Sequence, residues 1–184
     1  MKLIKAPSGS FSQYMRCDFE LMIEESKKTG ELDLDEEEST LLSNVFAMST
    51  IRVKESMCPR TDIMALEEGT SIEDLRQSFV ASGHSKIPIY KDNIDQIVGI
   101  AFAYDLFNDP KSLEDMLRPG TYVPETKLSK ELLREFLATN TSIAIVIDEY
   151  GGTAGLVTSE DLLEEIFGDI QDEFDTEENT LRII

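Results

Sequence analysis

The sequence is poor in the residues that most often carry catalysis and covalent cross-links. It has no tryptophan, one histidine (His84) and two cysteines, Cys17 and Cys58. A single histidine excludes metal sites built from several imidazoles, and two widely separated cysteines provide neither a disulfide framework nor a CxxC motif. This use of cysteine favours a reducing compartment.

Positive charge is also scarce. The 184 residues include 17 lysines and arginines against 37 aspartates and glutamates, which gives a net charge of −20. Such a chain repels the phosphate backbone of nucleic acids and anionic membrane surfaces, so we expect no nucleic-acid partner. Hydrophobic residues still make up 41% of the sequence, enough for the core of one domain or of two small units packed together.

Long hydrophobic segments are missing. The longest apolar run, Ile97–Tyr104, is well short of the ~18 residues that a membrane helix requires. Met1–Pro7 contains no apolar stretch of signal-peptide length. We therefore expect a soluble chain that does not itself insert into a membrane.

The sequence repeats itself after residue 53, and the repeat predicts the fold. Three landmarks recur in the same order at the same interval: Ile87-Pro88-Ile89 with Ile143-Ala144-Ile145, Gly99-Ile100 with Gly155-Leu156, and Asp105 with Asp161. We predict an α+β fold of two β-α-β-β-α units packed as a pseudo-symmetric pair. The expected divisions are a linker (1–18), a helical segment (19–52), unit 1 (53–118), unit 2 (119–178) and the start of a truncated C-terminal region (179–184).

Hydrophobic periodicity and turn signals place the elements of each unit. A capping box at Thr70–Glu73 and a cap at Ser129 predict where two helices begin. Unit 1 predicts a strand, a helix, two strands around a turn at Asp92–Asp95, and a second helix: Ile63–Leu66, Ile72–Val80, Lys86–Tyr90, Val98–Phe102 and Tyr104 onward. Unit 2 predicts the same order: Tyr122–Pro124, Ser129–Ala138, Ser142–Ile147, Gly155–Val157 and Ser159–Phe167.

This pattern resembles a pair of cystathionine β-synthase (CBS) domains, whose last strand runs into the last helix through G-h-h-[ST]-x-x-D. Gly155–Asp161 matches at every position, whereas Gly99–Asp105 has Phe102 at the hydroxyl position. Further motifs resemble the CorC/HlyC family, which is hemolysin-like and related to the cyclin-M transporters: Met57–Ile63, Gly83–Tyr90, Ile147–Thr158 and Glu164–Asp175. The resemblance implies the cytoplasmic regulatory part of a magnesium/cobalt efflux transporter, with the membrane transport domain as its partner.

Thr158 and Asp161 are the main candidates for ligand binding. A carboxylate can accept from both hydroxyls of a ribose, and a threonine hydroxyl adds a polar contact beside it. The resemblance implies that this ribose belongs to an adenine nucleotide such as AMP or ATP. The same Thr-x-x-Asp pattern is also an ordinary helix start, and the two roles are compatible. The resemblance adds these residues from unit 1 to the site: Arg60, Thr61, Ile63, Ser85, Lys86 and Ile87. It implies a second, weaker site around Asp105, Tyr122, Val123 and Ile143, which Phe102 disfavours.

The net charge predicts that Mg²⁺ helps to bind a nucleotide, because Arg60 and Lys86 alone offset few phosphate charges. No lysine or arginine lies between Arg134 and Arg182. The acidic residues there alternate with Leu162, Leu163, Ile166 and Phe167, so we expect the carboxylates to form one outward face. That face is either solvated or a weak cation-binding surface, whose candidate ligands are Glu160, Glu164, Asp169, Asp172 and Glu173.

Three functions remain open on the sequence alone. The first is the nucleotide-sensing regulatory module described above, which we expect to form a homodimer. The second is a dimerisation or interaction module with vestigial ligand sites, which Phe102 supports for one site. The third is a Mg²⁺-dependent nucleotide hydrolase, which lacks residues to position a water nucleophile, so we expect no enzyme.

Overall fold

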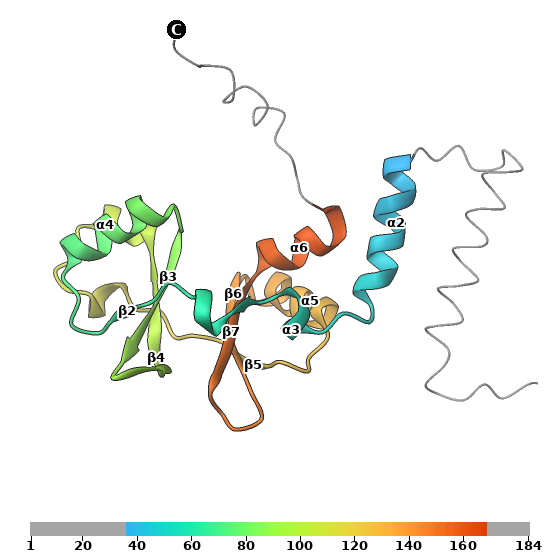
Figure 1. The fold of residues 1–184 in the computed structure, drawn as a ribbon. Coiled ribbons are helices and arrows are strands. Elements are labelled where there is room, and N and C mark those ends of the chain that lie inside the picture. The colour runs from blue at the N-terminus through green and yellow to red at the C-terminus, as the bar shows by residue number, and fades with distance from the viewer. Residues whose placement is uncertain (1–35, 169–184) are drawn as a thin grey trace, which may run out of the picture. The chain divides into compact units, whose positions relative to one another are not determined.

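A computed structural model describes residues 36–168 and divides the chain into two units (Figure 1). One unit is Arg52–Leu162, and the other comprises residues 1–51 and 163–184. The second unit contains α2 (Glu36–Met48), where Asn44 Nδ2 donates to the Ile166 carbonyl oxygen at 3.0 Å. The rest of the predicted helical segment, residues 19–35, lies outside the described residues. Within residues 36–168, no helix is long and apolar enough to cross a membrane.

The first repeat forms a three-stranded sheet in the order β2-β3-β4. Its elements are β2 (Leu66–Glu67), α4 (Ile72–Ser82), β3 (Lys86–Lys91) and β4 (Asn93–Phe102). β2 is parallel to β3, and β3 is antiparallel to β4. Apolar side chains of α4, of the sheet and of the segment around the 3₁₀ helix η3 (Glu114–Met116) are buried together in one core: Leu75, Phe79, Ile87, Ile89, Ala101, Leu113 and Met116.

The second repeat forms a four-stranded sheet in the order β1-β7-β6-β5. Its own elements are β5 (Tyr122–Pro124), α5 (Ser129–Thr139), β6 (Ile143–Ile147), β7 (Thr153–Thr158) and α6 (Ser159–Phe167). Four of the five residues of β6 are buried, as the continuous apolar run of this strand predicts. Strand β1 (Cys58–Pro59) belongs to the first repeat in sequence and is preceded by α3 (Val53–Ser56).

Each sheet is extended by backbone that precedes the other repeat. Cys58 pairs with Leu156 of β7, and Arg118 forms an antiparallel bridge with Ile100 of β4. The glycine before each partner permits this approach: a Cβ at Gly155 would lie 2.6 Å from the Cys58 carbonyl oxygen, and one at Gly99 would lie 2.9 Å from that of Arg118. The repeats therefore form the predicted pseudo-symmetric α+β pair.

A helix, a strand and a turn of the first repeat differ from the prediction. The helix expected from Tyr104 onward is a 3₁₀ helix, η2 (Ala103–Asn108). It ends because Asp109 has φ of 53° and precedes Pro110, which disfavours the α conformation at that residue. The strand expected at Ile63–Leu66 is reduced to Leu66–Glu67, after the 3₁₀ helix η1 (Arg60–Asp62). The turn expected at Asp92–Asp95 is shorter, because β4 already begins at Asn93.

Helices α4 and α5 begin at Ile72 and Ser129 as predicted, but their N-caps differ from the prediction by one residue. Ser71, not Thr70, caps α4 by accepting from the Asp74 N–H at 3.1 Å. The N-cap of α5 is Leu128, without a side-chain hydrogen bond. Ser129 is instead fully buried, with its hydroxyl 3.3 Å from that of Ser56. Packing against α3 therefore decides the conformation of Ser129.

Candidate functional site

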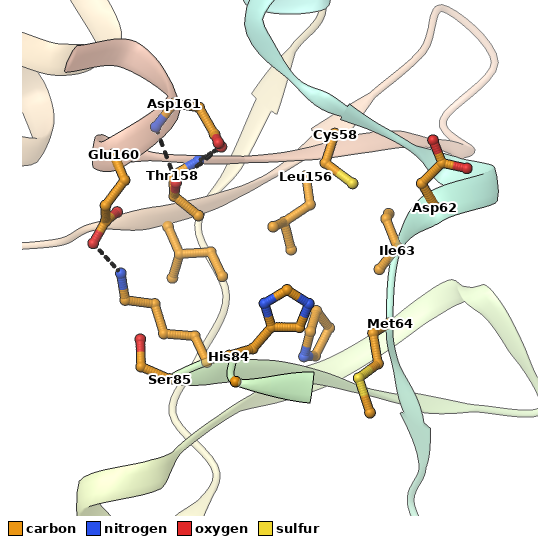
Figure 2. A pocket seen from close by; sticks show the side chains of 14 residues that line it. Cys58, Asp62, Ile63, Met64, His84, Ser85, Leu156, Thr158, Glu160 and Asp161 are labelled. Atoms are coloured by element: carbon orange, nitrogen blue, oxygen red, sulfur yellow. Dashed lines mark hydrogen bonds and ion pairs between the residues drawn. The ribbon is translucent and has the colours of Figure 1, made fainter. Parts of the chain in front are cut away.

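A cavity of about 350 Å³ lies between the two repeats in the Arg52–Leu162 unit (Figure 2). Three segments supply its walls: the chain from β1 through η1, the turn from α4 into β3, and the junction of β7 with α6. The lining residues are Cys58, Asp62, Ile63, Met64, Gly83, His84, Ser85, Lys86, Pro88, Ile143, Leu156, Thr158, Glu160 and Asp161. Its volume lies within the range of small-molecule sites.

Thr158 and Asp161 hold each other at the start of α6. Asp161 Oδ2 accepts from the Thr158 N–H at 2.7 Å and from its hydroxyl at 2.8 Å (Figure 2). In return, the Asp161 N–H donates to Thr158 Oγ1 at 3.3 Å. Both bonds to the carboxylate use Oδ2, so its orientation is fixed while Oδ1 can accept from a ligand. The hydrogen bonds of the helix start therefore use Oδ2 of Asp161 and not Oδ1.

Lys86 and Glu160 form an ion pair on the same side of the cavity. Lys86 Nζ lies 2.9 Å from Glu160 Oε1, and the lysine side chain is 13% exposed (Figure 2). Burial raises the pKa of Glu160, but the hydrogen bond from Lys86 and smaller contributions outweigh it, so that the pKa is lowered. With Asp62 and Asp161, three carboxylates and one lysine line this cavity.

The opposite wall comes from the segment around β1. Cys58 is half-buried, and burial, followed by the negative charges of Asp62 and Asp161, raises the pKa of its thiol. Ile63, Met64 and other apolar side chains complete this wall. An apolar surface facing a carboxylate suits a ligand with one apolar and one hydroxyl-rich face.

Of the eight residues predicted for this site, five line the cavity and three do not. The five are Thr158, Asp161, Ile63, Ser85 and Lys86. Ile87 is fully buried in the core of the first repeat, with 0% of its surface accessible, and does not line the cavity. Arg60 and Thr61 lie in η1 outside the lining residues.

The Arg60 guanidinium forms an ion pair with Asp95. Its Nη2 donates to Asp95 Oδ2 at 2.9 Å, and its Nη1 donates to Asp95 Oδ1 and to the Thr153 carbonyl oxygen. The hydrogen bond from Arg60, helped by one from the Thr153 N–H, lowers the pKa of Asp95 to about 2. Arg60 thus links η1 to the β3–β4 hairpin and to β7, and its charge is already balanced.

Several lining residues were absent from the prediction. Cys58 and Asp62 lie within the motif Met57–Ile63, and Gly83 and His84 lie within Gly83–Tyr90. Both motifs were therefore a usable signal for these positions. Glu160 was predicted only as part of an acidic face, because sequence does not reveal its pairing with Lys86.

A second cavity, of about 390 Å³, lies at the related position in the pair. Its lining residues are Ser85, Lys86, Ile100, Phe102, Tyr104, Arg118, Pro119, Thr121, Asn140, Thr141, Ser142 and Ile143. Of the predicted second site, only Ile143 is among them. Val123 is buried, and the Tyr122 hydroxyl donates to the Ile97 carbonyl oxygen at 2.8 Å. Asp105 is paired with Arg118, whose Nη2 lies 3.0 Å from Asp105 Oδ1.

The predicted acidic face does not form a metal cluster in the part of the chain that the structure describes. Among residues 36–168, no three histidine, cysteine, aspartate or glutamate side chains are grouped to hold an ion. Glu160 pairs with Lys86, and Glu164 also has an interaction partner. Asp169, Asp172 and Glu173 lie outside the described residues.

The fold and comparison with known proteins define the chain as a tandem CBS-domain pair. The CBS domain family matches twice, over residues 53–109 and 111–168. The CBS domain of a bacterial CNNM/CorC family Mg²⁺ transporter is 32% identical, with a TM-score of 0.77, and the match covers 84% of this chain and 97% of that one. The chain therefore belongs to the CNNM/CorC (CorC/HlyC) family, which confirms the predicted resemblance.

Three further proteins similar to this chain have names that bear on function. The magnesium and cobalt efflux protein CorC of Vibrio cholerae is 36% identical over 151 residues, which are 79% of this chain and 52% of that protein. A CNNM/CorC CBS domain solved in complex with ATP is 35% identical, with a TM-score of 0.69 and coverage of 72% and 99%. A CBS pair of Klebsiella pneumoniae with bound AMP is 29% identical, with a TM-score of 0.55 and coverage of 64% and 99%. The chain thus spans about half the length of this CorC relative.

Proposed function

We propose that this chain is a regulatory module that binds an adenine nucleotide, ATP or AMP, in the cavity beside Thr158 and Asp161. The observation that carries the proposal is the geometry of Asp161. Its Oδ2 accepts two hydrogen bonds from Thr158, which leaves Oδ1 outside these bonds on a residue that lines the cavity. A preoriented carboxylate binds a pair of hydroxyls without first losing side-chain freedom.

The apolar wall supports an adenine base as the second half of the ligand. Ile63, Met64 and Leu156 lie in the same cavity as Asp161. A purine placed against these side chains buries apolar area, while its ribose meets the carboxylate. The ATP-bound and AMP-bound neighbours are consistent with this assignment.

Asp161→Asn tests the proposal, with Asp105→Asn as the matched control in the other repeat. The amide retains the volume and still caps α6, but it loses the charge that strengthens both hydroxyl hydrogen bonds. We expect the affinity to fall by about 1.5–3 kcal/mol, roughly 10- to 150-fold, as measured by calorimetry on protein whose helix content is intact. Equal affinity in Asp161→Asn and the parent, with a loss only in Asp105→Asn, would assign the ligand to the other repeat.

Mg²⁺ is expected to enter with the nucleotide. The cavity presents the carboxylates of Asp62, Glu160 and Asp161 against the single ammonium group of Lys86. A triphosphate adds further negative charge, which a hydrated Mg²⁺ offsets. ATP affinity should therefore rise between EDTA and millimolar Mg²⁺, and AMP affinity should rise less. Equal ATP affinity in both conditions would contradict the bridging role.

The module is expected to regulate transport rather than to catalyse a reaction. The part of the relatives outside this chain is where we place the membrane transport domain, with this module on the cytoplasmic side and its ligand state controlling efflux of magnesium or cobalt. A phosphate-release assay with ATP and Mg²⁺ separates this role from hydrolysis. Continuous phosphate release that is lost in Asp161→Asn would show that the chain is a nucleotide hydrolase and would contradict the regulatory role.

We also propose that the module forms a homodimer through α4 and α5. Val80 in α4 is 81% exposed, and Leu137 at the equivalent position of α5 is 78% exposed. Two large aliphatic side chains at related positions are the pattern that an isologous interface requires, because the same surface then serves both subunits. The interaction-module alternative shares this dimer and differs only in lacking a ligand.

A further inference from the structure

The Arg118 side chain lines the second cavity and pairs with Asp105, whose own side chain is not among the lining residues of that cavity. Its Nε donates to Asp105 Oδ2 at 3.2 Å, and its Nη2 donates to Oδ1 at 3.0 Å. Both carboxylate oxygens are therefore used by one guanidinium, and the Asp105 side chain is only 13% exposed. The hydrogen bond that Arg118 donates to Asp105 raises the pKa of the guanidinium, which therefore remains charged.

Two aromatic rings hold the guanidinium in place. The Arg118 Cζ lies 5.1 Å from the centroid of the Phe102 ring and 4.9 Å from that of Tyr104. Arginine over an aromatic face is attracted by the ring quadrupole. Phe102 therefore not only lacks the hydroxyl of the motif, because its ring also contacts the Arg118 guanidinium.

The backbone fixes Arg118 as well. The Ile100 N–H donates to the Arg118 carbonyl oxygen at 2.9 Å, and the Arg118 N–H donates to that of Ile100 at 3.1 Å. In the first cavity, the corresponding segment pairs Cys58 with Leu156. Cys58 and Arg118 therefore occupy equivalent positions on the segments that extend the two sheets. The residue near Asp161 is a cysteine with a short side chain, and the residue near Asp105 is an arginine with a long cationic one.

We propose that Arg118 is the residue that decides which cavity accepts a nucleoside. It acts as an internal occupant of the Asp105 carboxylate and keeps that group out of the lining of the second cavity, whereas Cys58 leaves Asp161 in the lining of the first cavity. The proposal takes the ligand class from the function proposed above and adds the determinant of stoichiometry. It predicts one nucleoside per chain in the parent protein.

The first experiment removes the occupant and restores the motif with Arg118→Ala combined with Phe102→Thr. The probe is adenosine, because an uncharged nucleoside separates recognition of ribose from phosphate electrostatics. Calorimetry should give one equivalent for the parent and two for the double variant. Arg76→Ala is the matched control: it removes an exposed arginine of α4 and should leave one equivalent.

The second experiment places an arginine in the first cavity with Cys58→Arg. The new guanidinium can reach Asp161, so adenosine affinity should fall at least tenfold, while Cys58→Ser should stay within threefold of the parent. Circular dichroism establishes that the variants are folded. If Cys58→Arg does not fold, the Arg118 experiment alone decides the proposal.

The outcomes separate this inference from the proposed function. Two equivalents in the parent, or no additional equivalent in the double variant, overturn the role of Arg118. Loss of AMP binding in Arg118→Ala without any gain also overturns it, because Arg118 would then bind phosphate. If the parent binds no adenosine but the double variant binds one equivalent, the proposed function of the first cavity fails and the role of Arg118 stands.

Discussion

The last strands of the two repeats lead into different helices, although both are followed by an aspartate at the same place. β7 leads into α6 (Ser159–Phe167), where Asp161 is held by Thr158. β4 leads into the short η2 (Ala103–Asn108), where Asp105 is held by Arg118. The same position of the repeat therefore carries a carboxylate held by its own helix start in one case and half of an internal ion pair in the other. Two neighbours differ between the repeats. The hydroxyl position of the motif holds Thr158 or Phe102, and the segment that extends the sheet contributes Cys58 or Arg118.

The largest expected difference between the repeats concerns stability. Leu162 of α6 is fully buried, whereas Leu106 at the equivalent position of η2 is only partly buried. Leu162→Ala should lower the free energy of unfolding by about 2–5 kcal/mol, because it removes buried methylene groups and leaves a cavity. Leu106→Ala should cost less than half of that in the same urea titration. Equal losses would mean that η2 packs as tightly as α6.

The second prediction concerns a feature that the repeats share. Leu137→Glu places a carboxylate on the proposed dimer face and removes the apolar area of a leucine, worth roughly 1.5–3 kcal/mol if that side chain is buried. The dimer should therefore dissociate at least tenfold more readily, as measured by light scattering over a concentration series. Val80→Glu should act in the same direction with a smaller effect. A parent protein that is monomeric throughout the series contradicts the interface.

The third prediction tests what Thr158 adds to Asp161. Thr158→Val keeps the shape but removes the hydroxyl that donates to Asp161 Oδ2 at 2.8 Å. One lost hydrogen bond to a charged group should lower nucleotide affinity about tenfold, by calorimetry. The Thr158 N–H still donates to the same oxygen, so the loss should remain smaller than that of Asp161→Asn. A larger loss than in Asp161→Asn would place Thr158 in direct contact with the ligand.

The smallest expected effect is the pH dependence of the Arg60–Asp95 ion pair. The pKa of Asp95 falls from its usual value near 3.8 to about 2 in the folded protein. A lowered folded-state pKa stabilises the protein above the unfolded value, and this contribution is lost as the pH falls from about 4 to about 2. The carboxylate is 40% exposed, so solvent screens the effect.

Asp95→Asn should therefore reduce the drop in urea midpoint between pH 5 and pH 2.5. The exposed Asp92 of the same hairpin provides the matched control, because Asp92→Asn also removes one carboxylate and suits a residue with φ of 58°. Identical drops in Asp95→Asn and the parent would show that the pair adds no pH-dependent stability.

Much of the fold could be predicted because the second repeat follows local rules. β5 and α6 begin and end where hydrophobic periodicity placed them, at Tyr122–Pro124 and Ser159–Phe167. The helix predicted from Tyr104 onward is instead a short 3₁₀ helix, because the Asp109–Pro110 pair ends it early. The strand at Ile63–Leu66 was too long because η1 takes up the preceding residues.

The candidate site could be predicted only where its residues lie in a local motif. Thr158 and Asp161 are three residues apart, so their mutual hydrogen bonds follow from a helix start. The partners of Arg60, Lys86 and Arg118 depend on which segments the fold brings together. Asp95 is not distinguished by sequence from the other acidic residues of this chain. Sequence singles out Asp105 and Glu160 but does not show which cation each of them pairs with.

Each sheet is extended by a segment that precedes the other repeat, and this pairing affects the order in which the chain can fold during synthesis. Strand β1 emerges from the ribosome early, but its partner β7 lies almost at the end of the described chain. Cys58 and Pro59 must therefore wait for Gly155 and Leu156, whereas the bridge between Ile100 and Arg118 can form much sooner. Because the wall of the first cavity is carried by the segment around β1, a nascent chain cannot complete that cavity until both repeats have been made.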